Sequence, residues 1–242
     1  MSFIKEPQER ALFRDNVARL LEVEVAPHYE QWEKDGIVPA QIWRTLGIAG
    51  LLCVDMPEEF GGCGVPFDYS VVVGAELARM GFGALATNVM VHSDIVAPYL
   101  QHIGSEQQKQ HLLPRMASAE DVWCQMFSEP SAGSDVAGLR TSAVKQGDKW
   151  VVNGQKIWTS GAQHSDYGVI LCRTDTEVSK YRGMTMFYID MHQPGVDVKP
   201  IKQMDGDAHF NEVFFNDAEI PDNQRLGEVG GGWGAALLVL MN

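Results

Sequence analysis

The first half of the chain carries apolar residues at helical spacing. In residues 7–27 charged residues separate the apolar positions, as in an amphipathic helix; these positions are Leu12, Val17, Leu20, Leu21 and Val25. The same pattern predicts helices over 39–52, 68–80 and 87–103, and a shorter helix that opens at Ser105 and ends near Pro114. Residues 57–66 are rich in Gly and Pro and indicate a loop.

From about residue 121 the apolar positions follow a period of two. Residues 143–152 form two alternating stretches around Gly147-Asp148, and Asn153-Gly154 predicts a second tight turn. Further strands are expected where Val, Ile, Phe and Tyr are enriched, over 167–173, 184–191, 196–203 and 210–216. The sequence shows no strand–helix–strand alternation and no Gly-x-Gly-x-x-Gly motif after a strand, which disfavours a Rossmann fold.

These patterns predict an α+β protein with several domains. We expect an all-helical domain over residues 1–120, followed by an antiparallel β-barrel or sandwich over residues 121–231. Residues 232–242 predict the start of a further helix, and no capping residue ends it. We therefore expect the chain to stop inside a third, C-terminal helical domain.

Composition and charge narrow the class of protein. The 242 residues are 45% hydrophobic and 21% charged, as in a folded chain, and the net charge is −13 with an acidic excess in both halves. This balance argues against nucleic acid as the main partner. No apolar run is long enough for a membrane span, and the start lacks the apolar stretch of a signal peptide. The four cysteines form no CxxC pair and the histidines show no ligand spacing, so we expect a cytoplasmic protein with reduced thiols and no metal site.

The first stretch with candidate chemistry is the polar turn in residues 125–135. A strand is expected to end near Ser128, Pro130 forces a turn, and Gly133 lets the backbone come close to a ligand. The hydroxyls of Ser128 and Ser134, with the free N–H groups of the turn, suit phosphate oxygens or the edge of a flat heterocycle. From residue types alone, an ordinary loop between strands is the alternative.

The second stretch is residues 156–161. Alternation places Trp158 and Ser160 on one face of a strand and Thr159 on the other. An indole beside a hydroxyl can cover a flat ring while the hydroxyl bonds its edge; the alternative is a core tryptophan with a solvated serine. The serines of the polar turn stand in no nucleophile elbow, which disfavours a hydrolase.

Together, and in this order, the two stretches resemble the acyl-CoA dehydrogenase family over almost the whole chain. Residues 127–135 (FSEPSAGSD) are similar to the family signature, with Ser131 where Gly is usual, and residues 156–160 (KIWTS) resemble its flavin-stacking strand. Three shorter pieces support the likeness, at 57–62, 210–215 and 232–242.

The resemblance implies a helical domain, a β-barrel and a C-terminal four-helix bundle, with FAD between barrel and bundle. Phe127 would contact the flavin through its backbone, and Ser128 through its backbone and hydroxyl. In the second stretch Trp158 would pack on one face of the ring and Ser160 would hydrogen-bond near N5 and the C4 carbonyl, with Thr159 between them in the same cofactor strand.

For the substrate, the resemblance places Ser134 near the phosphate or pantetheine part of an acyl-CoA, and makes the helices at 68–80 and 87–103 one wall of the acyl channel. The implied reaction is FAD-dependent α,β-dehydrogenation of an acyl-CoA thioester to the 2-enoyl-CoA. The implied partners are an electron-transferring flavoprotein and further copies of the chain, as a dimer or tetramer.

The catalytic glutamate of the family lies in its C-terminal bundle. No glutamate of this chain matches it, so we assign no catalytic residue here and expect the chain alone to be inactive. Three alternatives stay open at this point: an acyl-CoA oxidase, a flavin monooxygenase of the same superfamily, or a non-catalytic lobe that binds CoA or a partner subunit.

Overall fold

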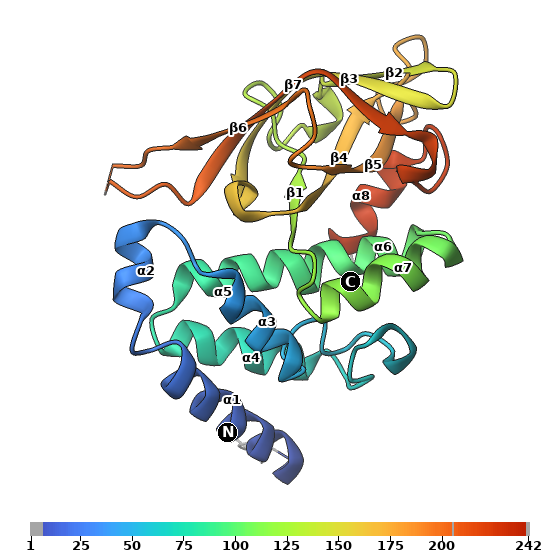
Figure 1. Cartoon of the computed structure of the whole chain (residues 1–242). Coiled ribbons are helices and arrows are strands. Elements are labelled where there is room, and N and C mark those ends of the chain that lie inside the picture. The colour runs from blue at the N-terminus through green and yellow to red at the C-terminus, as the bar shows by residue number, and fades with distance from the viewer. Residues whose placement is uncertain (1–6, 205, 241–242) are drawn as a thin grey trace, which may run out of the picture.

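The computed structural model describes residues 7–204 and 206–240, with helices first and a sheet after them (Figure 1). The helical region contains seven α-helices within this part of the chain, and a π-helical segment, Val91–Val96, joins α5 to α6. The helices are α1 (Gln8–Glu24), α2 (Tyr29–Asp35), α3 (Ala40–Ile48), α4 (Asp68–Arg79), α5 (Gly83–Met90), α6 (Ala97–Ile103) and α7 (Glu106–Ala117).

The expected helices are present, with differences at their ends. α7 begins where predicted, because Ser105 and Gln108 form a capping box: Ser105 Oγ accepts the Gln108 N–H at 3.2 Å and Gln108 Oε1 accepts the Ser105 N–H at 2.8 Å. The predicted end near Pro114 is wrong, because the buried side chains of Leu113 and Met116 carry the helix on to Ala117. Helix α2 is an element that the apolar spacing did not predict.

The remaining chain forms one eight-stranded sheet in the order β6-β7-β3-β2-β4-β5-β8, with β1 paired to β4. The strands are β1 (Trp123–Met126), β2 (Ser142–Gln146), β3 (Lys149–Ser160), β4 (Tyr167–Arg173), β5 (Met184–Asp190), β6 (Val196–Ile201), β7 (Phe210–Pro221) and β8 (Arg225–Leu226). The predicted order of helices followed by a β region is confirmed. The sheet is mixed rather than purely antiparallel, because β1 runs parallel to β4.

The expected hairpin at Asn153-Gly154 is wrong: the turn lies at Gly147-Asp148, and β3 runs straight through residues 153 and 154. Gly154 has a φ of +147°, and a Cβ there would lie 2.6 Å from Thr141 Oγ1, so glycine serves a close approach between strands rather than a turn. Asn153 bonds across the sheet to Asp217, from Nδ2 to Oδ1 at 2.9 Å. The Asn-Gly pair therefore marks a β-bulge opposite β7.

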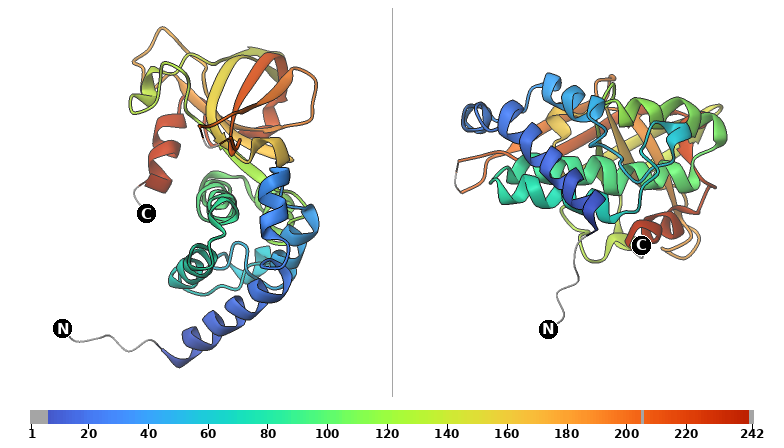
Figure 2. Two further views of the ribbon diagram at one scale, coloured as in Figure 1. Left: turned by 90° about the vertical axis from the view of Figure 1, so that its left-hand side faces the viewer. Right: turned by 90° about the horizontal axis from the view of Figure 1, so that it is seen from below.

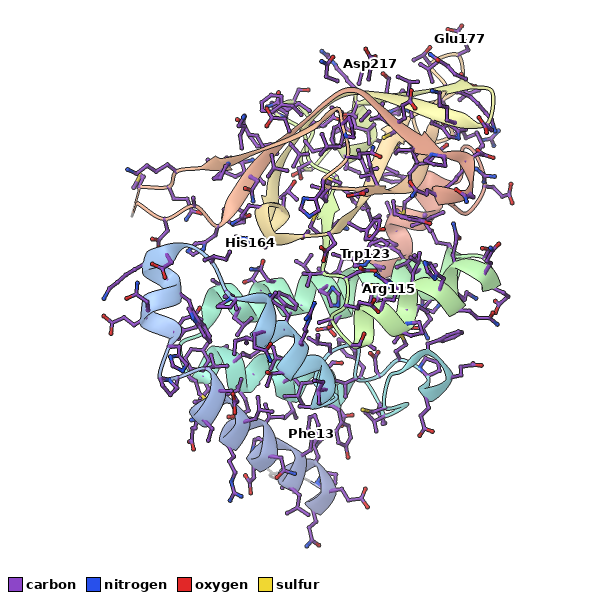
Figure 3. The ribbon with its side chains drawn as sticks, viewed as in Figure 1. Phe13, Arg115, Trp123, His164, Glu177 and Asp217 are labelled. Atoms are coloured by element: carbon purple, nitrogen blue, oxygen red, sulfur yellow. The ribbon has the colours of Figure 1, made fainter. Side chains whose placement is uncertain are left out.

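Helix α8 (Gly232–Leu240) and strand β1 connect the two regions. β1 rises from the helices into the sheet, and α8 descends from the sheet edge to contact β5 and α6 (Figures 1 and 2). Trp123 lies between helices and sheet and stacks on Tyr167 with ring centroids 5.0 Å apart (Figure 3). At the start of β1, Arg115 makes a two-point ion pair with Asp121 at 2.5 and 2.7 Å. Within the described residues, no helix is long and apolar enough to cross a membrane.

Candidate functional site

A groove of about 710 Å³ lies between α4, the α5–α6 helical run, β1 and α8. Its lining is mainly apolar and small, with a few polar groups: Phe67, Ser70, Val71, Gly74, Ala75, Ala78, Ala86, Thr87, Met90, Asp94, Ile95, Tyr99, Gln125 and Val239. The two helical stretches expected to wall an acyl channel thus supply most of this surface. A mainly apolar groove of this volume can hold an alkyl or branched acyl chain.

The π-helical segment places a carboxyl group in this groove. Asp94 lies in the segment, and burial, with the Asp55 charge nearby, raises the pKa of Asp94 to about 6. The Ser70 hydroxyl lies close enough to lower that pKa, yet neither Ser70 Oγ nor Asp94 Oδ1 completes a hydrogen bond of normal geometry with any described residue. The groove therefore contains polar groups that the fold leaves incompletely paired.

The polar turn begins directly beside the groove. Gln125 of β1 lines the groove and donates from Nε2 to Tyr99 Oη at 3.2 Å, and Tyr99 packs on Phe127 with ring centroids 5.8 Å apart. Glu129 and Ala132 exchange two backbone hydrogen bonds at 2.9 and 3.0 Å, which close the turn. Phe127 and Ser128 thus occupy the link between the groove and the turn, and both are half-buried.

The second predicted stretch lies against this turn. The Ile157 N–H donates to the Ser128 carbonyl at 2.9 Å, so β3 and the turn are bonded to each other. The pairing of β3 with β7 is shifted between Lys156 and Thr159, and Trp158 there has a left-handed φ of +61°. Such a backbone is strained for a side chain of this kind, and strained residues concentrate at functional sites.

Burial alternates through residues 158–160 as the sequence predicted. Trp158 is 58% exposed and meets Phe210 edge to face, with ring centroids 6.0 Å apart. Thr159 is buried with its hydroxyl enclosed, so any contact of Thr159 with a cofactor would come from its backbone. Ser160 lines a separate cavity of about 190 Å³ against α5, and Thr87 borders both this cavity and the groove. The cavity that Ser160 lines therefore adjoins the groove at Thr87.

Ser134 is further from the groove along the chain than Ser128, on the far side of the polar turn. It is exposed in the loop after the turn, next to Asp135, whose carboxylate pairs with Lys180 at 2.8 Å. The described residues contain no group of three or more His, Cys, Asp or Glu side chains that could hold a metal ion. The structure thus bonds the turn at Ser128 to β3 at Ile157, connects Phe127 to the groove through Tyr99, and leaves Ser134 on the exposed outer loop.

The sequence interpretation missed a buried pair of charged residues, Lys156 and Glu129, and the half-buried Asp94. Lys156 and Glu129 form an ion pair at 2.8 Å between β3 and the turn. The alternation that starts at Trp150 and Val152 places Lys156 on the inward face of the same strand, and this signal could have identified it. Asp94 gave a weaker signal, as a single acid in an apolar helical stretch.

Comparison with known proteins identifies the family. The chain matches the models "Acyl-CoA dehydrogenase, N-terminal domain" over residues 7–120 and "Acyl-CoA dehydrogenase, middle domain" over residues 124–218. Since these two matches cover most of the chain, it belongs to the acyl-CoA dehydrogenase family.

Relatives agree with this assignment. The chain is 38% identical over 211 residues to the acyl-CoA dehydrogenase IpdE1 of Mycobacterium tuberculosis, covering 86% of this chain and 54% of that protein. It is 33% identical to the mitochondrial long-chain specific acyl-CoA dehydrogenase of Sus scrofa, covering 91% and 51%. A crystal structure of an acyl-CoA dehydrogenase from Geobacillus kaustophilus superposes with a TM-score of 0.93 at 36% identity, covering 98% of this chain and 63% of that one. The chain thus spans about half the length of these two relatives.

Proposed function

We propose that this chain supplies the flavin and acyl-CoA contacts of an FAD-dependent acyl-CoA dehydrogenase. The observation that carries the proposal is adjacency: the apolar groove touches Tyr99, which packs on Phe127, and it shares Thr87 with the cavity that Ser160 lines. An acyl chain in the groove and a flat ring held by the two motifs would therefore meet.

The residues present fit a flavin. Trp158 is largely exposed although tryptophan is usually buried, and its indole is free to cover an aromatic ring. Ser128 offers an N–H and a hydroxyl to the polar edge of the ring, and Ser160 offers a second hydroxyl. When bound, FAD would supply the hydride acceptor of the reaction.

In this proposal the residues of the chain bind and orient the acyl-CoA and the cofactor. The groove would hold the acyl chain, the turn would fix one edge of the cofactor, and Ser134, on the exposed loop after the turn, would contact the phosphate or pantetheine part of the thioester. Thr159 contributes through the backbone of the cofactor strand. We assign no proton-abstracting base to any residue of this chain.

The test is an anaerobic titration of the full-length protein with acyl-CoA thioesters of increasing chain length. We expect bound FAD, loss of its visible absorption on adding acyl-CoA, and a 2-enoyl-CoA product. A protein without flavin would contradict the cofactor assignment, and flavin that no acyl-CoA reduces would contradict the activity. The second result would favour a non-catalytic CoA-binding lobe.

The proposed electron acceptor is an electron-transferring flavoprotein. The support is the family assignment, and the discriminating measurement is the rate at which oxygen reoxidises the reduced flavin. Slow reoxidation, with rapid turnover when the flavoprotein is supplied, is expected. Rapid reoxidation by oxygen would favour an acyl-CoA oxidase or a flavin monooxygenase.

Assembly and location complete the proposal. We expect a dimer or tetramer of identical chains, to be measured by light scattering after size-exclusion chromatography. We expect a cytoplasmic location, because all four cysteines are free thiols, as in a reducing compartment.

A further inference from the structure

A buried ion pair joins the two halves of the candidate cofactor site. Lys156 Nζ lies 2.8 Å from Glu129 Oε1 and 3.1 Å from the Phe127 carbonyl oxygen. Lys156 belongs to β3 and Glu129 to the polar turn, so the pair bonds one motif to the other. The lysine side chain has no exposed surface, which is rare for this residue and excludes the role of a solvated charge.

The carboxylate of this pair is fully engaged. Besides Lys156, Glu129 accepts the backbone N–H of Arg140 at 2.6 Å and that of Thr141 at 2.9 Å. Burial alone would raise the pKa of Glu129, but the lysine charge and these donors outweigh it and hold the pKa below its ordinary value. A buried polar network with every member paired is rigid and has one geometry.

That geometry orients the backbone of the turn. Lys156 holds the Phe127 carbonyl, and the Ile157 N–H holds the Ser128 carbonyl. A trans peptide places its C=O and N–H on opposite sides, so holding the Phe127 carbonyl toward β3 aims the Ser128 N–H away from β3. The same short segment of β3 then continues into the left-handed Trp158.

We propose that Lys156, together with Glu129, is a positioning residue that sets both the Ser128 N–H and the Trp158 indole for the flavin, without touching the flavin itself. The inference rests on the proposed function only in taking FAD as the ligand. It assigns to a charged pair in the interior a role in cofactor geometry rather than in surface solubility.

The test compares two changes to the ion pair and one control in the full-length, flavin-loaded protein. Lys156→Met alone would remove the bond to Phe127 but leave Glu129 charged and buried. The first change is therefore the double variant Lys156→Met/Glu129→Gln, which removes both charges to protect the fold. Lys156→Arg keeps the positive charge and alters the shape of the buried side chain and the geometry of its donors. The matched control is Lys149→Met, on the same strand, whose ion pair with Glu219 is exposed.

We expect the double variant and Lys156→Arg to fold, as judged by circular dichroism, and to bind FAD at least tenfold more weakly with shifted flavin absorption bands. Lys149→Met should match the wild type in both measurements. Wild-type FAD affinity and spectrum in folded Lys156→Arg and in the folded double variant would overturn the positioning role.

The two proposals fail in different ways. A wild-type protein that takes up no FAD would overturn the proposed function, and the positioning role with it. Normal FAD uptake by the wild type, unchanged in the Lys156 variants, would overturn the positioning role alone. If the double variant does not fold, Lys156→Arg decides, because it keeps the charge balance of the interior.

Discussion

Two carboxyl groups of the candidate site, buried Glu129 and half-buried Asp94, have opposite environments. Glu129, on the sheet side, meets an ammonium and two N–H donors, and its pKa lies below the ordinary value. At Asp94, on the groove side, burial and the nearby Asp55 charge disfavour the ionised carboxylate, and they raise its pKa to about 6. The difference shows that the carboxylate of the turn is fully paired by described residues, whereas the groove retains polar groups that the described residues leave incompletely paired.

The strongest test of this comparison is removal of the Lys156 charge. Lys156→Ala leaves the Glu129 carboxylate buried without its cation, so we expect a loss of about 3–5 kcal/mol in the free energy of unfolding, measured by urea denaturation. Lys149→Ala removes the same group from an exposed pair and should cost less than about 1 kcal/mol. Equal losses in the two variants would show that the interior pair is no more than a surface contact.

The next largest effect on stability is expected on acidification, through His92, which bonds to α7 and to β1. His92 is buried and neutral, with Nε2 3.0 Å from the Met116 carbonyl and Nδ1 accepting the Trp123 N–H at 3.1 Å, and burial lowers its pKa to about 4. Because the unfolded chain takes up this proton near pH 6.5 and the folded chain near pH 4, stability falls as pH drops through this window, by up to about 3 kcal/mol.

The measurement for His92 is urea denaturation at pH 7 and pH 5 in the wild type and in His92→Gln. The wild type should lose more stability between the two values than the variant, because glutamine does not titrate. An identical pH dependence in both proteins would assign the acid sensitivity to other groups.

Removing the Asp94 carboxyl should stabilise the protein, whereas removing the Lys156 charge should destabilise it. A raised pKa in the folded state means that Asp94 favours folding only at low pH, and that this contribution disappears as pH rises from about 4 through 6. Asp94→Asn should therefore stabilise the protein by about 1–2 kcal/mol at pH 7, with no gain at pH 4. Denaturation at both values checks this, and destabilisation at pH 7 would place Asp94 in the same class as Glu129.

The smallest change in stability is expected at Trp158. Trp158→Gly relieves a left-handed backbone, worth about 1 kcal/mol, and loses an exposed contact with Phe210, so net stability should change by less than about 1 kcal/mol. FAD affinity should nevertheless fall at least tenfold, measured by fluorescence titration. The control is Asp217→Gly, another left-handed residue, which belongs to β7 and lies on the side of the sheet away from the helices (Figure 3). Equal effects of both variants on FAD would contradict the stacking role.

Periodicity and residue type predicted the order of the elements and the two motifs. Short motifs of this kind have local causes: the capping box at Ser105 and the alternation through Trp158 and Ser160 each depend on neighbours in the chain. The resemblance built on these motifs then agreed with the family that the comparisons identify.

What the sequence did not predict depends on distant contacts. The Asn153-Gly154 pair has the composition of a turn, but Thr141, just before β2, approaches Gly154, and no local rule contains that contact. The partner of Lys156 is likewise 27 residues away in the chain. The groove itself required the packing of α4 against the α5–α6 run, so its volume and its acid could not be assigned from spacing.

The π-helical segment has a consequence for the phase of the helix that contains it. Tyr99 comes nine positions after Met90, which is two and a half turns of an α-helix at about 3.6 residues per turn and would put the two side chains on opposite sides. Both nevertheless line the groove, because the wider turns at Val91–Val96 change the rotation between them. Deleting a single residue there would return the segment to an α-helix with eight steps of about 100° between Met90 and Tyr99, so the helix would shorten while Tyr99 and its bond to Gln125 stay on the groove side.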